Sequence, residues 1–319
     1  MTLPLIIVNP ASADGDTREK WPKMASDLRT HFGAFTVAFT ESPGHARQLA
    51  RDAANNRTKF VIACGGDGTI SEVANGIIDS KTNAELGILP SGTGGDFRRT
   101  LRMPNDTAAA ARALREGRTR TIDAVRVTFI NDIDERETRF SINVASFGMS
   151  TEVLDRTSSG DAKKWVPGFA PRKVGSKLSY AAATVQTTLA SSPIEVVVQI
   201  DDQPERRLRV AEFCVANARY YGGAMKIAPD AELQDGKFDV VTIGDASAFR
   251  ILANAPRLYF GAHLRMNEVT HVLAKQVVAR PVNKDKAVRV ELDGEVLGRL
   301  PSTFHIVPSA LKVRFPPTV

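Results

Sequence analysis

The chain has 319 residues, a length that corresponds as a soft prior to about two domains. Apolar residues make up 43% and charged residues 24%, which are ordinary globular values and exclude a disordered chain or a small disulfide-stapled scaffold. The net charge of +6 permits an acidic partner, such as a nucleotide, a phospholipid surface or a nucleic acid, and selects none of them.

The first third of the chain alternates short apolar runs with segments of helical periodicity. Strands are predicted at 5–8, 34–40, 60–64 and 86–89. Helices are predicted at 18–32, 43–54, 70–78 and 106–115. Because strands that alternate with helices form parallel sheets covered on both faces, residues 1–122 are expected to form an α/β domain with a parallel sheet.

The pattern changes near residue 122, where alternating or β-branched runs are separated by turn signals. Strands are predicted at 124–130, 139–144, 194–200, 207–217, 238–243, 287–292 and 303–315, with helices around 175–190 and 247–262. We therefore expect a β-rich, sandwich-like second domain over 123–302. A last strand, at about 303–319, can return to the first domain.

The strongest chemical signal is the run Gly65-Gly66-Asp67-Gly68-Thr69, between a buried strand and a helix. Small residues there let backbone N–H groups approach a phosphate, and the helix N-terminus favours the anion. A carboxylate at this place would repel a triphosphate unless a divalent cation lies between them. The plain alternative is a strand-to-helix turn.

A second run of the same type, Pro90-Ser91-Gly92-Thr93-Gly94-Gly95-Asp96-Phe97, follows the next predicted strand. Two glycine-rich loops at the carboxyl ends of neighbouring strands would face one crevice, where open α/β sheets bind ligands. The sequence has neither a P-loop nor the Gly-x-Gly-x-x-Gly dinucleotide fingerprint. The five histidines show no close metal-ligand spacing, which argues against a zinc site.

Further blocks accompany these loops, and together they carry a resemblance. They are Val8-Asn9-Pro10-Ala11-Ser12, Thr40 with Gly44-His45-Ala46, Asn217-Ala218 with Tyr221-Gly222-Gly223, Ala228-Pro229, Asp235-Gly236 and Asp293-Gly294-Glu295. Over nearly the whole chain the set resembles the diacylglycerol kinase catalytic family, which also holds sphingosine and ceramide kinases. The glycine-rich signature is shared with NAD kinases and related to phosphofructokinases, so the resemblance implies their type of α/β fold for the first domain. Gly95 stands where this family usually has Asn, and Arg98 where a small residue is common.

The resemblance implies ATP and Mg²⁺ as cofactors, with nucleotide binding in the first domain and a lipid substrate in the second. The nucleotide site would comprise Asn9, Thr40, Gly65, Gly66, Asp67, Gly68, Thr69, Ile70, Ser71, Glu72, Gly92, Thr93 and Asp96. Glu295 would be the general base, with Asp293 as its neighbour and Asp67 organising the Mg²⁺–phosphate region. Alone, Asp293-Gly294 favours an ordinary hairpin turn. A structural Mg²⁺ would lie at Glu232, Asp235 and Lys237, or this segment is a plain turn.

The positive charge is concentrated in two stretches. Residues 98–120 hold seven arginines and two acids, and residues 162–178 hold five basic residues, Trp165 and no acid. Basic residues among aromatic ones suit an anionic membrane surface or single-stranded nucleic acid. The plain alternatives are a solvated loop and a solvated helix face. No nucleic-acid-binding motif is recognisable, so nucleic acid is not an expected partner.

The location expected from the sequence is the cytoplasm, peripheral to a membrane. Two cysteines, Cys64 and Cys214, make no disulfide framework and suit a reducing compartment. We find no apolar run of about 20 residues and no secretion signal. An exposed sheet edge in the second domain could pair two copies into a homodimer. The alternatives to a lipid kinase are a soluble-metabolite kinase of the NAD kinase type and a non-catalytic nucleotide or membrane sensor.

Overall fold

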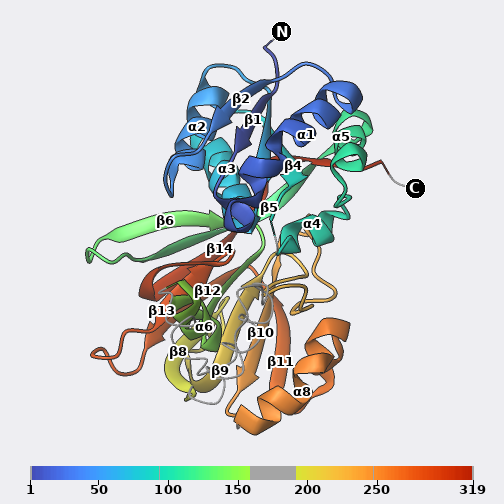
Figure 1. Cartoon of the computed structure of the whole chain (residues 1–319). Coiled ribbons are helices and arrows are strands. Elements are labelled where there is room, and N and C mark those ends of the chain that lie inside the picture. The colour runs from blue at the N-terminus through green and yellow to red at the C-terminus, as the bar shows by residue number, and fades with distance from the viewer. Residues whose placement is uncertain (1, 93, 159–191, 247, 318–319) are drawn as a thin grey trace, which may run out of the picture.

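The computed structural model describes residues 2–92, 94–158, 192–246 and 248–317 (Figure 1). Its helices are α1 (Asp16–His31), α2 (His45–Asn55), α3 (Asp67–Ser80), α4 (Asp96–Leu101), α5 (Thr107–Glu116), α6 (Met149–Ser158) and α8 (Ala248–Phe260). The predicted helix at 175–190 lies outside the described residues. The one predicted at 247–262 corresponds to α8.

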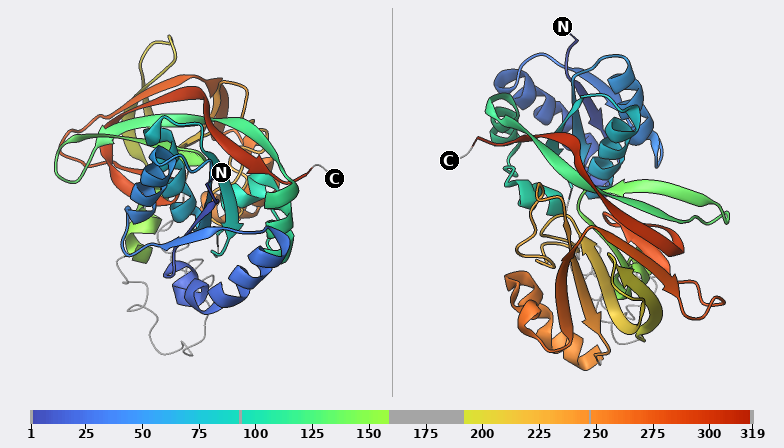
Figure 2. Two further views of the ribbon diagram at one scale, coloured as in Figure 1. Left: turned by 90° about the horizontal axis from the view of Figure 1, so that it is seen from above. Right: turned by 180° about the vertical axis from the view of Figure 1, so that it is seen from behind.

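The first layer is built on four short strands: β1 (Leu5–Val8), β2 (Thr36–Phe39), β3 (Phe60–Gly65) and β4 (Glu85–Pro90). They lie in the order β2-β1-β3-β4, and each neighbouring pair is parallel. Every residue of β3 is buried, as expected for a central strand of a parallel sheet with helices on both faces. Helices α2 and α3 pack together on one side of these strands, and α1 and α5 pack together on the other (Figures 1 and 2).

The remaining strands form a β-rich second layer, in which all the pairings are antiparallel. They are β5 (Arg118–Ile130), β6 (Arg136–Ser141), β7 (Val144–Gly148), β8 (Ile194–Ile200), β9 (Arg206–Ala216), β10 (Phe238–Gly244), β11 (Val269–Ala274), β12 (Gln276–Pro281), β13 (Arg289–Leu292) and β14 (Glu295–Phe315). Stacked rings of Phe147 and Phe213, 4.7 Å apart, lie in its core. The predicted two-part architecture, α/β first and β-rich second, is confirmed.

Strand β14 joins the two layers. Its 21 residues pair with β12, β13 and β5, and its end pairs in parallel with β4 through Lys312 and Val313. Strand β5 also runs unbroken across residue 122, where the sequence pattern changes. The two layers therefore share strands (Figure 1), and the hairpin between β13 and β14 contacts α3 of the first layer through Ser71 and Gly68.

Candidate functional site

The two glycine-rich loops lie against each other at the carboxyl ends of β3 and β4. A Cβ on Gly92 would lie 2.6 Å from the Cα of Gly66, so only glycine permits this approach. The backbone N–H of Ser91 donates to the carbonyl oxygen of Gly65 at 3.2 Å. The structure thus brings the two predicted loops together. Thr93, predicted for the same site, lies outside the described residues.

Asp67, at the start of α3, caps the N-terminus of α4. Its Oδ2 accepts N–H groups from Gly95 at 2.8 Å and Asp96 at 3.1 Å, and its Oδ1 accepts the N–H of Phe97 at 3.2 Å. A Cβ on Gly94 would lie 2.7 Å from Asp67 Oδ2. The carboxylate thereby satisfies N–H groups that a helix end leaves unpaired, and it fixes one glycine loop to the other.

Asp96 carries the connection on to the second layer. It is only 5% exposed, and it accepts backbone N–H groups from Gly223 at 2.8 Å and Ala224 at 2.7 Å, together with Arg99 Nη1 at 2.7 Å. Burial raises the pKa of Asp96, while the two N–H groups oppose that rise. The loop of residues 221–225 is therefore held at the glycine loops by one buried carboxyl group.

Gly95 has the left-handed backbone angle φ = 70°. Glycine and asparagine are the residues that adopt this region most readily, so the backbone explains why Gly replaces the Asn that the resemblance leads one to expect. A side-chain amide at this position is not needed to hold Asp96, whose oxygens are engaged by Gly223, Ala224 and Arg99.

Asn9 and Thr40 follow β1 and β2 at the same edge of the sheet. Asn9 Nδ2 donates to Thr69 Oγ1 at 3.0 Å, and the N–H of Thr40 donates to the carbonyl of Val8 at 2.9 Å. The sequence reasoning missed a nearby cluster of hydroxyl groups, in which Thr17 Oγ1 lies 2.6 Å from Ser12 Oγ and 2.5 Å from Ser91 Oγ. Serine and threonine in short loops carry no spacing rule that would have indicated it.

Three further predicted site residues on α3 have internal partners. The side chain of Ile70 is 1% exposed, in the core. Glu72 accepts the N–H groups of Gly44 at 2.8 Å and Ala46 at 3.0 Å, at the N-terminus of α2. Ser71 Oγ donates to Asp293 Oδ2 at 2.8 Å. These residues support the loops around the site.

Asp293 anchors the β13–β14 hairpin. The residue is 4% exposed and accepts four hydrogen bonds. The donors are the hydroxyls of Ser71 and Ser141 at 2.8 and 2.5 Å, and the N–H groups of Ile142 and Asn143 at 3.1 and 3.0 Å. Burial raises its pKa, and these donors oppose the rise. Because the protein supplies all of these partners, Asp293 holds the hairpin in position. The residue placed to accept a proton is its neighbour Glu295.

Glu295, two residues further on, lies over the first glycine loop. Its Oε1 is 2.6 Å from the place where a Cβ on Gly68 would be, so the side chain touches the first turn of α3. Burial, followed by the neighbouring carboxylates of Glu72 and Asp293, raises the pKa of Glu295 to about 7. A carboxyl group with this pKa can accept a proton near neutral pH.

Two buried carboxyl groups that the sequence did not reveal, Glu291 and Glu212, lie near the hairpin, and Glu291 contacts it directly. Glu291 Oε1 accepts the N–H of Gly294 at 3.1 Å, and its Oε2 accepts Ser146 Oγ at 2.7 Å. Glu212, fully buried on β9, accepts the N–H of Ser150 at 2.9 Å, and burial raises its pKa to about 8. The hairpin is thus held through both its side chains and its backbone.

The predicted structural metal segment forms a turn before β10. Asp235 Oδ1 accepts the N–H of Lys237 at 3.0 Å, and Glu232, Asp235 and Lys237 are all exposed. One carboxylate and the turn's carbonyl groups are oxygen donors of the kind Mg²⁺ accepts. Within the described ranges, no three His, Cys, Asp or Glu side chains are grouped so as to hold a metal ion.

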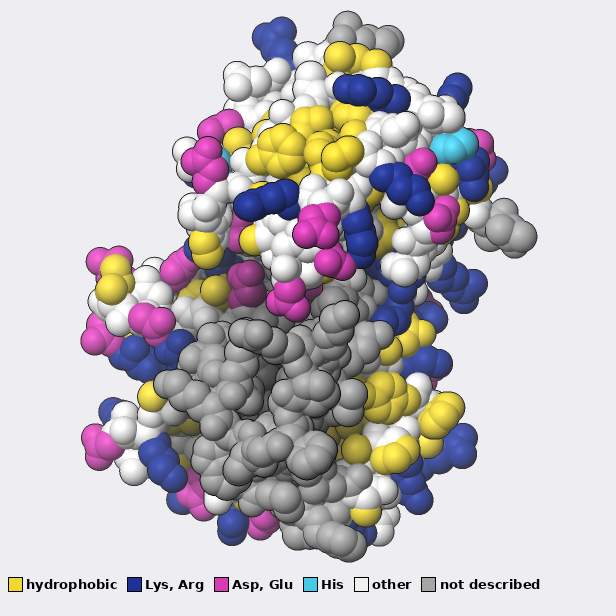
Figure 3. Space-filling view, in the orientation of Figure 1, with side chains coloured by type: hydrophobic (Ala, Val, Ile, Leu, Met, Phe, Trp, Pro, Cys, Tyr) yellow, Lys and Arg dark blue, Asp and Glu magenta, His cyan; other side chains and the backbone are white. Residues whose placement is uncertain are grey.

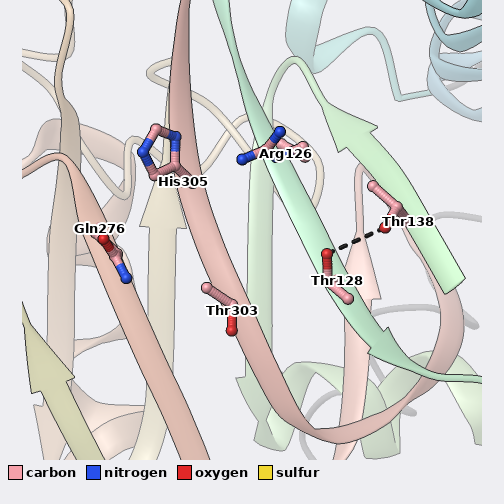
Figure 4. Close-up of a pocket in the computed structure, with 6 residues that line it drawn as sticks. All are labelled: Arg126, Thr128, Thr138, Gln276, Thr303 and His305. Atoms are coloured by element: carbon pink, nitrogen blue, oxygen red, sulfur yellow. Dashed lines mark hydrogen bonds between the residues drawn. The ribbon is translucent and has the colours of Figure 1, made fainter. Parts of the chain in front are cut away.

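The described part of the chain has two further features that bear on function. A cavity of about 390 Å³ on the β-rich layer is lined by Arg126, Thr128, Thr138, Gln276, Thr303 and His305 (Figure 4), none of which was predicted for the site.

Among the described helices, none is both long and apolar enough to cross a bilayer. The basic stretch at 162–178 lies outside the described residues.

Comparison with known proteins finds two family models that match successive parts of the chain. The sequence model of the diacylglycerol kinase catalytic domain matches residues 4–127, and that of the YegS C-terminal NAD kinase beta sandwich-like domain matches residues 164–315. A diacylglycerol kinase of Bacillus subtilis (strain 168) is 30% identical over 94% of this chain and 91% of its own length. One from Mycobacterium tuberculosis (strain H37Rv) is 30% identical over 97% and 94%. The crystal structure of a diacylglycerol kinase from Bacillus anthracis superposes with a TM-score of 0.71 at 20% identity, covering 99% of this chain and 97% of that one.

Proposed function

The chain belongs to the diacylglycerol kinase catalytic family, and from that premise we propose that it transfers the γ-phosphoryl group of ATP to the hydroxyl of diacylglycerol or a similar lipid alcohol. Family membership makes it a phosphotransferase of the kinase type. The observation that carries the proposal is Glu295, a carboxyl group with a pKa of about 7 in contact with the glycine loop at Gly68. A lipid hydroxyl must lose a proton as it attacks, and this group can take it.

In this proposal the two glycine loops bind the phosphates of ATP. The N–H groups at the start of α3 and the close backbone contact of Gly66 with Gly92 offer a surface without side chains, which a polyphosphate can approach. Asn9 and Thr40, at the ends of neighbouring strands, would contact the rest of the nucleotide. The hydrogen bonds that Asp67 and Asp96 accept keep these loops in place before the substrate arrives.

Mg²⁺ fits the chemistry of the site, because Asp67 and Asp96 place two carboxylates beside the loops. Bound with the nucleotide, the ion would neutralise charge on the phosphates. Asp67 and Asp96 would orient it, and Asp293 would hold the hairpin so that Glu295 faces the acceptor hydroxyl. A structural Mg²⁺ at the turn of Glu232, Asp235 and Lys237 is a separate proposal, supported by the oxygen donors of that turn.

The substrate class also implies where the protein works. A lipid alcohol lies in a bilayer, so we propose a cytoplasmic protein that contacts an anionic membrane surface peripherally. The edge strand β11, with Val272 and Leu273 44% and 49% exposed, is the place where a second copy could pair. Analytical ultracentrifugation of the chain and of its Leu273→Lys variant would test that pairing.

The test of the activity is transfer of labelled phosphate from ATP to a panel of lipid alcohols with Mg²⁺ present. We expect a labelled phospholipid from at least one of them, and a loss of about a hundredfold or more in Glu295→Gln. Asp67→Ala is expected to lose activity together with nucleotide binding. Folded protein that labels no lipid would overturn the proposal, and labelling of NAD in place of lipid would establish the soluble-metabolite kinase instead.

A further inference from the structure

A second cavity lies on the side of the molecule where the C-terminal end of β14 leaves the fold (Figure 1). It has a volume of about 660 Å³ and is bounded by the end of α4, by α5, by the segment of residues 231–234 and by the end of β14. None of the glycine loops, nor Glu295 or Asp293, lines it. The cavity is therefore separate from the proposed catalytic site.

Four arginines line this cavity: Arg102, Arg112, Arg120 and Arg219. Arg102 and Arg112 are exposed and form no ion pair with any described residue. The guanidinium of Arg120 lies 5.1 Å from the ring centre of Phe315, and Arg219 Nε donates to the carbonyl of Ala231 at 3.0 Å. Figure 3 shows Lys and Arg side chains gathered at this level of the molecule. The basic stretch 98–120, seen first as a charge pattern, supplies three of the four.

The other residues that line the cavity are partly apolar and partly acidic, and this composition limits the chemical class of ligand that fits. Leu101, Leu233, Phe315 and three prolines contribute apolar surface. Glu116 and Glu232 lie in the lining as well and reduce its net charge to about +2, the charge that matches a phosphate monoester dianion. Arginine presents its N–H groups in a planar fork that suits phosphate oxygens.

We propose that this cavity binds an organic phosphate, meaning a phosphate monoester or phospholipid headgroup that carries an apolar portion. The arginines that have no internal partner engage the phosphate oxygens, and the apolar lining covers the attached carbon chain. Like charges held together on a fold repel one another, and an anionic ligand removes that repulsion. The site goes beyond the proposed kinase activity, since binding there requires no turnover and no ATP.

The cavity has one structural connection with the catalytic region, through α4. Thr100 Oγ1 accepts the N–H of Arg219 at 3.4 Å, and Arg102 follows the last residue of the helix. Asp96 begins the same helix and holds the 221–225 loop. A ligand in the cavity would therefore contact one end of a helix whose other end is part of the glycine loops.

Isothermal titration calorimetry of the full chain without nucleotide tests the proposal, with hexyl phosphate, inorganic phosphate and hexanol as the probes. The variant Arg102→Gln/Arg112→Gln removes from the cavity the two charges that have no partner among the described residues. The control Arg115→Gln/Arg118→Gln removes two charges from the same stretch, at exposed positions that do not line it. The variant Ala109→Leu fills the cavity without changing its charge, and leucine is a good helix former.

We expect wild type and the control variant to bind hexyl phosphate equally. The cavity double variant should bind it at least about tenfold more weakly, because that is the effect of losing one charge-assisted hydrogen-bonding pair. Ala109→Leu should also weaken binding. If inorganic phosphate binds more weakly than hexyl phosphate and hexanol does not bind, the result supports a ligand that combines a phosphate with an apolar portion. Equal affinity for inorganic phosphate would overturn the apolar portion. No binding by wild type, or equal losses in the cavity and control variants, would overturn the site itself.

Discussion

Replacing Glu295 with Gln should slow phosphoryl transfer about a hundredfold or more and at the same time make the fold more stable. The side chain keeps its size and loses its charge, so the two effects separate chemistry from structure. In the folded chain the pKa of Glu295 is about 7, because the group is half-buried and lies beside Glu72 and Asp293. Its ordinary value is 4.5, so folding opposes ionisation of this carboxyl group.

The magnitude follows from linkage. Because the pKa of Glu295 is higher in the folded chain than in the unfolded chain, the folded chain binds this proton more strongly. The contribution of Glu295 to the free energy of unfolding is therefore fully present below pH 4.5 and is lost as the pH rises to 7. The difference lowers the free energy of unfolding by at most about 3 kcal/mol at and above pH 7. Glu295→Gln should recover up to that amount at pH 8 and almost nothing at pH 4.

Two assays check this. Urea denaturation of wild type and Glu295→Gln at pH 4 and pH 8 measures the stability gain, with Glu19→Gln, an exposed residue of α1, as the control. Transfer assays measure the activity of wild type, whose kcat/KM should rise about tenfold between pH 6 and pH 8 as the base ionises. A Gln variant with more than a tenth of the wild-type kcat/KM, or a variant that is less stable at pH 8, would refute the reasoning.

Three further experiments, with five substitutions between them, test the architecture of the site. Gly92→Ala should destabilise the fold by about 1–3 kcal/mol through the clash with Gly66, whereas Gly66→Ala, whose Cβ meets nothing nearer than 3.9 Å, should unfold at nearly the wild-type urea concentration. Asp293→Asn should lower thermal stability by about 3 kcal/mol, since an amide cannot accept all four buried donors; an unchanged melting temperature would contradict the anchoring role. Gly95→Asn should keep both stability and nucleotide binding, while Gly95→Val, forced into the left-handed region, should lose at least about 1 kcal/mol by calorimetry.

The sequence predicted best the elements whose signal is local. The predicted strands at 5–8 and 60–64 match Leu5–Val8 and Phe60–Gly65 almost residue for residue, since continuous apolar runs are typical of central parallel strands. Helix α4 was not predicted, and its cap explains why. The acceptor for its first N–H groups is Asp67, about thirty residues earlier in the chain, so no capping residue precedes the helix locally.

Hydrogen-bond partners that are distant in the sequence also explain why the contacts of the acidic residues could not be predicted. The proposed roles of Asp67, Asp96 and Asp293 toward nucleotide, metal and catalysis stay predictions. What the sequence did not indicate is that each also accepts hydrogen bonds from backbone N–H or hydroxyl groups of distant segments. A single sequence shows that a carboxylate stands in a loop and cannot show which distant donor faces it. Glu291 and Glu212, within ordinary strands, gave no signal at all, because a buried glutamate is recognised only from its surroundings.

Strand β14 also has a consequence for how the chain acquires its structure during synthesis. It is made after every other described strand, yet it completes pairings with β4, β5, β12 and β13. The strand pairings of both layers are complete only after residues 295–315 have been synthesised. Until then the earlier strands remain incompletely paired in the nascent chain. The hairpin with Glu295 is made in that same last step. The residue that we assign to catalysis therefore reaches its place only when the two layers are joined, which makes activity a direct report of complete folding.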